Sequence, residues 1–212
     1  MVGQLVRRGG SVLAALAVVV GGATMGAGVA GGASVGSSCT GIYEKLCNGE
    51  AFIDQGARGN ILLAYQGPAK AKVGSEVLYF PGLEARDGTP GLTVTSFTHH
   101  VPRGLEFVGA EVISYSPILP GAELDSTAMV DPVTGDVTVT APAGGWVIPT
   151  AVTDTGSRTG FLRVNLRYKV VKSYLDGNTG VTFTGTGAPA SEGWVATGFT
   201  TVTPVDLGTF GS

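Results

Sequence analysis

Hydrophobic and polar residues alternate with period two over Phe161–Val171, which reads FLRVNLRYKVV. The apolar positions are Leu162, Val164, Leu166, Tyr168 and Val170, and the polar ones are Arg163, Asn165, Arg167 and Lys169. Successive side chains of a β-strand point to opposite faces of the sheet. The pattern therefore predicts a strand with one face on a core and the other in water.

Shorter segments rich in Val, Thr and aromatic residues recur along the chain, separated by Gly, Pro, Asp and Asn. Turn signals about every 10–15 residues favour an all-β sandwich or a small barrel, with about 7–9 strands over residues 60–212. Strands do not alternate with long helical segments, so a parallel α/β sheet is not expected. The other predicted strands are Asn60–Tyr65, Val77–Phe80, Leu92–Val101, Leu105–Ile113, Val137–Thr140, Trp146–Val152, Val181–Thr186 and Trp194–Val202.

Residues 1–33 have the layout of a secretory signal peptide. Two arginines near the start are followed by the uncharged apolar run Val12–Val20 and then by small residues. The small residues place the cleavage after Ala30 or Ala33. Val12–Val20 is shorter than the roughly 20 apolar residues that an anchor needs, so an uncleaved anchor is the less favoured interpretation. We expect a protein that is secreted or associated with the cell envelope and contacts the membrane only through its signal peptide.

The chain has two cysteines, Cys39 and Cys47. In an exported protein they are expected to form a disulfide, and the short loop that it closes would contribute about 2–3 kcal/mol. A redox or metal site is the alternative, but the spacing and the absence of a nearby His match neither pattern. Lipidation of Cys39 is disfavoured because Gly36 stands where a lipobox has an aliphatic residue. Residues 34–59 are predicted to be an N-terminal segment with this local disulfide and a faint helical signal over Ile42–Ile53.

The predicted mature chain is acidic. Lys and Arg total 13, and Asp and Glu total 16. Signal cleavage removes only Arg7 and Arg8 from these counts, which leaves 11 basic against 16 acidic residues and a net charge of −5. The sequence has no run of Lys and Arg, so nucleic acid and anionic membrane surfaces are not expected partners. An envelope protein, glycan or lipid is the partner class that we expect.

The two histidines, His99 and His100, are adjacent. Adjacent side chains on a regular strand point to opposite faces, so both cannot serve one site. Base catalysis would need one of them to meet an acid and a hydroxyl in a cleft, and no nucleophile motif accompanies the pair. The sequence therefore predicts no catalytic residue, no cofactor and no enzyme. The histidines are expected to have a plain loop or strand-end role.

Several carboxylates lie around one predicted turn. Asp131 and Asp136 flank the turn, and Glu123 and Asp125 precede it. Carboxylates in β-loops can bind Ca²⁺, but this spacing matches no fixed motif. A solvated acidic turn is favoured, and no metal site is predicted.

Trp146 and Trp194 follow similar turns, in the stretches APAGGWV and APASEGWV. The similarity extends no further, so an internal repeat is not expected. The favoured interpretation is that both indoles cap the core where a strand begins. The alternative is an exposed pair that forms a surface for binding a sugar or a peptide.

Three motifs follow one another within Lys72–Val112: VGSEVLY at Val73–Tyr79, LTVT at Leu92–Thr95, and PRGLEFVGA at Pro102–Ala110. Together they resemble the conserved-repeat, Ig-like sandwich modules of bacterial surface proteins, a family named as a domain of unknown function. The resemblance implies an Ig-like β-sandwich that acts as a stalk or adhesion module and has no catalytic residues. The chain departs from the family pattern at Phe80-Pro81-Gly82, which interrupts the second strand.

The third motif has a clear physical basis. Pro102 lacks a backbone donor and ends a ladder, and Gly104 allows a turn that other residues resist. Leu105 and Phe107 then lie on one face of the next strand. Phe107 is predicted at the centre of the core, where Phe107→Ala would cost about 3–5 kcal/mol.

These patterns favour an exported, non-enzymatic β-sandwich with a structural, adhesion or partner-binding role at the cell envelope. The alternative is a secreted protein that holds an apolar ligand between its sheets, or a porin-like oligomeric subunit. A wide cavity between the sheets or a large exposed apolar patch would favour that alternative.

Overall fold

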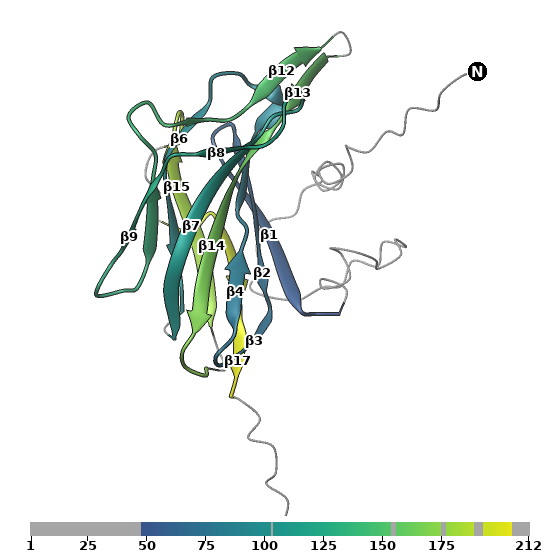
Figure 1. Ribbon diagram of the computed structural model, residues 1–212. Coiled ribbons are helices and arrows are strands. Elements are labelled where there is room, and N and C mark those ends of the chain that lie inside the picture. Colours follow the sequence, from purple (N-terminus) through teal and green to yellow (C-terminus); the bar gives the residue numbers. More distant parts are fainter. Residues whose placement is uncertain (1–47, 103, 154–155, 175–176, 189–192, 205–212) are drawn as a thin grey trace, which may run out of the picture. The chain divides into compact units, whose positions relative to one another are not determined.

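The computed structural model describes residues 48–204 except 103, 154–155, 175–176 and 189–192 (Figure 1). These residues belong to one compact unit, Cys39–Ser212. Their regular structure consists of seventeen strands and one short 3-10 turn, η1, at Arg86–Gly88. In this part of the chain no helix has the length and hydrophobicity needed to cross a bilayer. The predicted signal peptide, Cys39 and Cys47 lie outside the described residues.

The first sheet has seven antiparallel strands in the order β1-β2-β5-β14-β7-β8, with β4 also paired to β14. Its strands are β1 Ala51–Arg58, β2 Ile61–Pro68, β4 Glu76–Tyr79, β5 Gly82–Ala85, β7 Leu105–Tyr115, β8 Ala122–Leu124 and β14 Phe161–Val170. The strand with the period-two pattern, β14, lies at the centre of this sheet and pairs with β7 from end to end.

Phe80 and Pro81 join β4 and β5 into one line of pairing along β14. Pro81 has no N–H to donate, but its carbonyl accepts the N–H of Val164 at 2.9 Å. The Phe80 N–H donates to the carbonyl of Gln66 at 2.8 Å. The departure from the family pattern at this point is therefore a local irregularity between two strands of the same sheet.

The second sheet has the order β16-β15-β6-β10-β9, with β11 also paired to β6. Its strands are β6 Thr93–His100, β9 Thr127–Val130, β10 Val137–Thr140, β11 Trp146–Val147, β15 Asn178–Gly185 and β16 Ala196–Phe199. Two small pairs complete the fold: antiparallel β12 Thr150–Thr153 with β13 Gly156–Thr159, and parallel β3 Lys70–Lys72 with β17 Thr201–Thr203.

The two large sheets pack face to face, with β7 and β14 in one layer and β6 and β15 in the other (Figure 1). All five apolar positions of β14 that the alternation assigned to the core are buried. On β6, Val94, Phe97 and His99 face the same core. Each predicted strand range overlaps a strand of the structure. The prediction of an all-β, Ig-like sandwich is confirmed.

The beginning of the first strand and the beginning of the last strand both bond to Ala69. The Ala69 N–H donates to the carbonyl of Glu50, just before β1, at 2.8 Å. The Ala69 carbonyl accepts the N–H of Thr201, the first residue of β17, at 2.9 Å. On the same side β1 lies along β16, where the Thr197 N–H donates to the Asp54 carboxylate at 2.7 Å. These contacts join the edges of the two sheets.

The predicted helical signal over Ile42–Ile53 is wrong where the structure describes it, because residues 48–50 form a turn and a bend and β1 begins at Ala51. The first sheet thus starts before residue 60, where the sandwich was expected to begin. β1 could not be predicted from the sequence pattern because Phe52 is the main side chain that this strand contributes to the core. A single large apolar side chain does not establish a period of two.

The prediction for Phe107 also needs correction. Phe107 is half-buried and packs against the margin of the core, with its ring edge-to-face with Tyr168 at 5.7 Å between centroids. The centre is occupied instead by Phe97 and Tyr168, which are fully buried. The expected role of Gly104 is confirmed, since its φ is 111° and a Cβ there would lie 3.2 Å from Lys172.

Candidate functional site

Strand β6 separates its two histidines onto opposite faces, as the sequence predicted. His99 is fully buried between the sheets, and His100 lies partly exposed on the outer face of the second sheet. They therefore belong to two different environments.

His99 is surrounded by three hydroxyl groups in the core. Its Nδ1 lies 2.7 Å from the Tyr168 hydroxyl, and its Nε2 lies 2.6 Å from the Tyr65 hydroxyl and 3.0 Å from Thr179 Oγ1. Tyr65 and Thr179 are themselves 2.6 Å apart, and the Thr179 hydroxyl donates to the carbonyl of His100. Strands β2, β6, β14 and β15 thus meet in one hydrogen-bonded network.

The number of available protons determines which group donates and which accepts in this network. The Thr179 hydroxyl donates its only proton to the backbone carbonyl of His100, so the Tyr65 hydroxyl must donate to Thr179. The Tyr65 oxygen can then accept only from a protonated His99 Nε2. Nδ1 is consequently the acceptor and receives the Tyr168 hydroxyl proton. A neutral His99 with its proton on Nε2 satisfies each of these contacts.

Burial supports the same protonation states. It lowers the pKa of His99 to about 3, so the ring is neutral at physiological pH. Burial also raises the pKa values of Tyr65, Tyr79 and Tyr168 well above their ordinary value of 10. This neutral, enclosed network fixes the packing of the core, and the protonation states of its members do not change near pH 7.

Aromatic rings fill the middle of the sandwich. The ring centroid of Tyr79 lies 4.7 Å from that of His99, 5.7 Å from that of Tyr168 and 6.1 Å from that of Tyr65. The Tyr79 hydroxyl contacts Thr200 Oγ1 at 2.8 Å, and Thr200 donates to the carbonyl of Pro68. These contacts fill the space between the sheets around His99.

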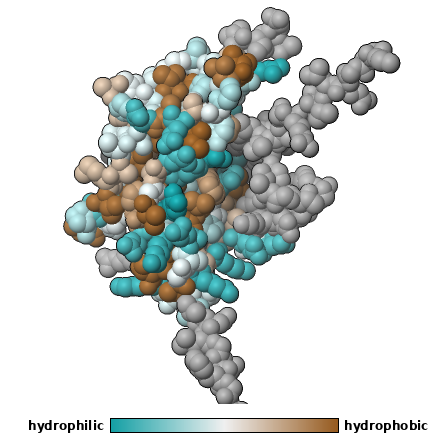
Figure 2. Space-filling view, viewed as in Figure 1, coloured by the Kyte–Doolittle hydropathy of each residue, from teal (hydrophilic) through white to brown (hydrophobic). Residues whose placement is uncertain are grey.

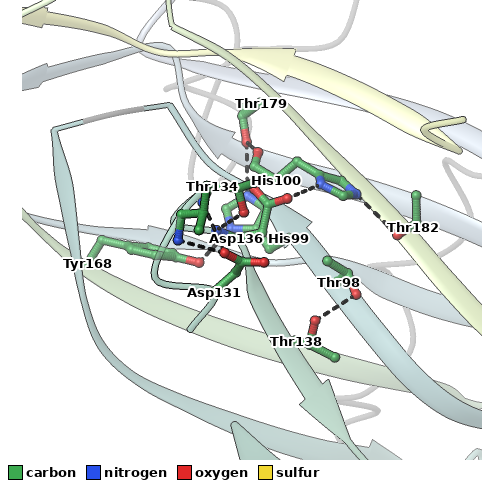
Figure 3. A network of polar contacts seen from close by, with 11 residues as sticks. Thr98, His99, His100, Asp131, Thr134, Asp136, Thr138, Tyr168, Thr179 and Thr182 are labelled. Carbon is green, nitrogen blue, oxygen red and sulfur yellow. Dashed lines mark hydrogen bonds and ion pairs between the residues drawn. The ribbon is translucent and has the colours of Figure 1, made fainter. Parts of the chain in front are cut away.

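On the outer face, His100 contacts an acid and a hydroxyl (Figure 3). Its Nδ1 lies 2.7 Å from the Asp136 carboxylate, just before β10, and its Nε2 lies 3.2 Å from the Thr182 hydroxyl on β15. An acid, an imidazole and a hydroxyl thus meet here, which is the arrangement that base catalysis would require.

Trp194 lies flat over the same part of the sheet. Its ring is stacked on His100, with 5.5 Å between centroids and 15° between planes. It also covers Gly180, where a Cβ would come within 2.2 Å of the indole. The side chain remains 44% exposed, and its N–H makes no hydrogen bond to the described residues. One face of the indole rests on the protein and the other is open.

The strands around Trp194 present rows of hydroxyls to solvent, and we call this surface the threonine face. Thr138, Thr98 and Thr182 stand opposite one another across β10, β6 and β15, and Thr98 contacts Thr138 at 3.0 Å. Ser96 and Thr184 form a second row, with their oxygens 2.7 Å apart. The alternation in TVTSFTHH could have indicated this face from sequence, but the role of Thr179 could not.

A second exposed aromatic residue lies at the β16 edge of the threonine face. Phe199 is 47% exposed and pairs with the exposed Asn178. Its neighbour Gly198 faces inward, where the ring of Phe52 leaves no room for a Cβ. Adjacent residues alternate, so Phe199 points outward.

The two predicted tryptophans have opposite environments. Trp146 is only 3% exposed, and its indole N–H donates to the carbonyl of Asp125 at 2.9 Å. Trp146 therefore caps the core, as the favoured interpretation held, and does not belong to the possible binding surface. Of the two tryptophans, Trp194 is the exposed one.

The acidic turn has a structural explanation. Asp131 accepts the N–H groups of Val133 and Thr134 at 2.7 and 3.0 Å, and these bonds lower its pKa. Asp136 is paired with His100. Among the described residues no group of three or more His, Cys, Asp or Glu side chains could hold a metal ion.

The outer face of the first sheet has a different chemistry. Arg163 donates to the Tyr115 hydroxyl and lies over the ring of Tyr115, 4.9 Å from its centroid. Further along β14 the outward residues Arg167 and Lys169 are exposed. Hydrophilic and hydrophobic side chains are interspersed on the side of the molecule seen in Figure 2. Cations thus project from the first sheet, whereas β6, β10, β15 and β16 contain neither Lys nor Arg.

No family model and no curated protein sequence matches this chain, so the resemblance to the conserved-repeat modules stays a prediction. Solved structures are similar to it at low identity. A cohesin module from a family 33 glycoside hydrolase of Clostridium perfringens ATCC13124 is 10% identical, with 69% of this chain and 98% of that one covered and a TM-score of 0.47. The collagen-binding domain of a Staphylococcus aureus adhesin is 10% identical, with 65% and 95% covered and a TM-score of 0.35.

The major pilin subunit BcpA of Bacillus cereus is 13% identical, with 73% of this chain and 41% of the pilin covered and a TM-score of 0.41. None of these likenesses bears on what this chain does.

Proposed function

We propose that this chain is an exported, non-enzymatic β-sandwich module that binds a partner at the cell envelope through the threonine face. The observation that carries the proposal is the position of Trp194. Its indole lies flat on Gly180 and His100 with one face open to solvent. Leaving a large aromatic ring exposed and positioned is typical of recognition surfaces, where aromatic anchors provide most of the binding energy.

The arrangement of Asp136, His100 and Thr182 does not support acyl transfer. A triad also needs an oxyanion hole, usually formed by backbone N–H groups left free at a sharp turn or a helix N-terminus. Thr182 lies instead within a strand that pairs with β6, on an open sheet face. The His100 ring is moreover covered by Trp194. These contacts position the indole, and that is the role we assign to them.

The absence of catalysis can be tested with a generic ester. We expect wild-type protein and His100→Gln to hydrolyse p-nitrophenyl acetate at the same rate. A rate in the wild type at least tenfold above that of His100→Gln would show that the triad is active and would overturn the non-enzymatic assignment.

Binding through the threonine face is tested with envelope preparations. Trp194→Ala should lower the amount of purified protein that sediments with a cell-envelope fraction at least tenfold. Leu78→Ala is the matched control, because Leu78 is 43% exposed but belongs to the first sheet. Equal sedimentation of wild type and Trp194→Ala would overturn the proposal.

Self-association is a second candidate function, and strand β9 is the observation that favours it. β9 is an edge strand of the second sheet, and all four of its residues, TAMV, are exposed and uncharged. Met129 on β9 is 74% exposed, and Val133 in the following turn is 82% exposed. Edges without charged residues readily pair with another strand. Sedimentation equilibrium would detect a dimer that Met129→Lys dissociates, and a monomer at all concentrations would exclude this candidate.

A further inference from the structure

We infer that the threonine face binds a neutral polysaccharide, with one sugar ring stacked on Trp194. This inference rests on the proposed function and names the chemistry of its partner. Three observations lead to it: the orientation of the indole, the hydrogen-bonding groups around it, and the absence of Lys and Arg from the strands that form the face.

The indole is held as a flat platform. Gly180 beneath it has no Cβ, which lets the ring lie directly on the backbone of β15. His100 is fixed by Asp136 and Thr182 and supports the indole with a nearly parallel ring. The open face of an aromatic ring carries partial negative charge, which suits the C–H groups on one face of a pyranose. A platform held from below in this way loses little side-chain freedom when a sugar stacks on it.

Hydrogen-bonding groups surround the platform. Among the described residues the indole N–H of Trp194 has no acceptor, and the side-chain amide of the exposed Asn178 makes no hydrogen bond. The hydroxyls of Thr182 and Thr98 lie on the same face, bonded to His100 and Thr138, and each hydroxyl oxygen can take part in a further hydrogen bond. A sugar offers both donors and acceptors around its ring and could bond to each of these groups. An acyl chain would cover them and remove their hydrogen bonds to water without providing new ones.

Phe199 offers a second contact, far enough from the Trp194 platform to meet a neighbouring sugar of the same polymer. Phe199 and Asn178 are two residues along the strands from Thr197 and Gly180, in register. Two residues of a β-strand span about 7 Å. The outward Phe199 can therefore contact the polymer beside the ring that stacks on Trp194.

Charge selects a neutral polymer. The strands that form the face contain neither Lys nor Arg, and His100 is already paired with Asp136. Arg58 of β1 reaches the margin of the face, where its guanidinium donates to the carbonyl of Gly193 at 3.4 Å. Asp54 contributes a carboxylate at the β16 edge, where it accepts the N–H of Thr197. On the strands of the face, phosphate and carboxylate groups of an anionic polymer would find no counter-charge, and the uncharged hydroxyls of a neutral glycan need none.

The experiment follows the emission of Trp194. In Trp146→Phe the remaining indole is Trp194, and a circular dichroism spectrum establishes that this variant is folded. The probes are neutral glucans, mannans, galactans and arabinans, the anionic polymer hyaluronate, and vesicles of phosphatidylcholine with phosphatidylglycerol. If Trp146→Phe does not fold, the difference in emission between wild type and Trp194→Phe isolates the same signal.

We expect at least one neutral glycan to shift the emission to the blue and to lower acrylamide quenching at least twofold, with saturation. Gly180→Ala should weaken this binding at least tenfold, because the new methyl group displaces the indole without removing it. Leu78→Ala should bind like the wild type. No saturable shift with any neutral glycan, or a shift with hyaluronate or vesicles alone, overturns the inference. The proposed function survives that result if Trp194→Ala still abolishes envelope sedimentation.

Discussion

His99 and His100 are joined by one peptide bond, yet the ring of His99 is fully buried while that of His100 stacks under an exposed indole. The alternation of β6 places one in the core network and the other on the threonine face. Substitutions at the two positions should therefore have separable effects, the first on stability and the second on the surface.

Acid should destabilise the protein through His99. Burial lowers the pKa of His99 from 6.5 to about 3. The unfolded chain takes up this proton near pH 6.5 and the folded chain only near pH 3. The contribution of His99 to stability is therefore complete above pH 6.5 and declines as the pH falls toward 3, by about 1.4 kcal/mol per unit. Urea unfolding at pH 7, 6 and 5 measures the effect.

His100→Asn serves as the control for that measurement, because it removes the other histidine and should leave the decline between pH 7 and pH 5 intact. A free energy of unfolding that stays constant over this interval in the wild type would contradict the assignment of His99 as a buried, neutral group.

Removing the hydroxyl of Tyr168 should destabilise the core. Tyr168→Phe leaves the Nδ1 acceptor of His99 buried without a donor, which is expected to cost about 1–3 kcal/mol. Tyr174→Phe is the matched control, since the buried Tyr174 hydroxyl oxygen has no hydrogen-bond partner among the described residues and its loss should be neutral or slightly stabilising. Chemical denaturation of the two variants compares them directly, and equal losses would argue against the network.

Tryptophan fluorescence should separate the two indoles. Trp194→Phe leaves Trp146, which is expected to emit in the blue and resist acrylamide because it is buried and bonded to the Asp125 carbonyl. Trp146→Phe leaves Trp194, which should emit further to the red and be quenched readily. Similar quenching in both variants would place the two side chains in equivalent environments and refute the assignment.

Two phenylalanines on consecutive strands of the chain, Phe97 on β6 in the second sheet and Phe107 on β7 in the first, should differ in their contribution to stability. Phe97 is fully buried, so Phe97→Ala is expected to cost about 3–5 kcal/mol. Phe107 is half-buried at the margin, and Phe107→Ala should cost about half as much. Thermal melts of both variants provide the comparison, and a larger loss for Phe107→Ala would restore it to the centre of the core.

The sequence predicted those parts of the fold that depend on local alternation. β14 was evident because each of its inward positions is apolar and each intervening position is polar or charged. Gly104 was evident because Pro102 and Gly104 mark a turn by their own backbone chemistry. β5 was missed because a proline such as Pro81 normally ends a strand, whereas here its carbonyl continues the pairing with β14.

The candidate site was less predictable because it depends on contacts between distant residues. Trp146 and Trp194 have almost the same local sequence, but one indole meets the Asp125 carbonyl and the other meets Gly180 and His100. Nothing near either tryptophan in the sequence distinguishes these outcomes. The enclosure of His99 likewise requires hydroxyls from β2, β14 and β15, which only the packing of two sheets brings together.

The position of Ala69 has a consequence for how the module could be built into other polypeptides. Because Ala69 bonds to Glu50 on one side and to Thr201 on the other, the residue before β1 and the first residue of β17 lie about 10 Å apart, two strand spacings, and β17 ends two residues later. A short linker could join them, and new ends could be opened at the exposed Val133 turn without breaking a strand. The fold is therefore suited to circular permutation, and to insertion as a side branch into a loop of a host protein.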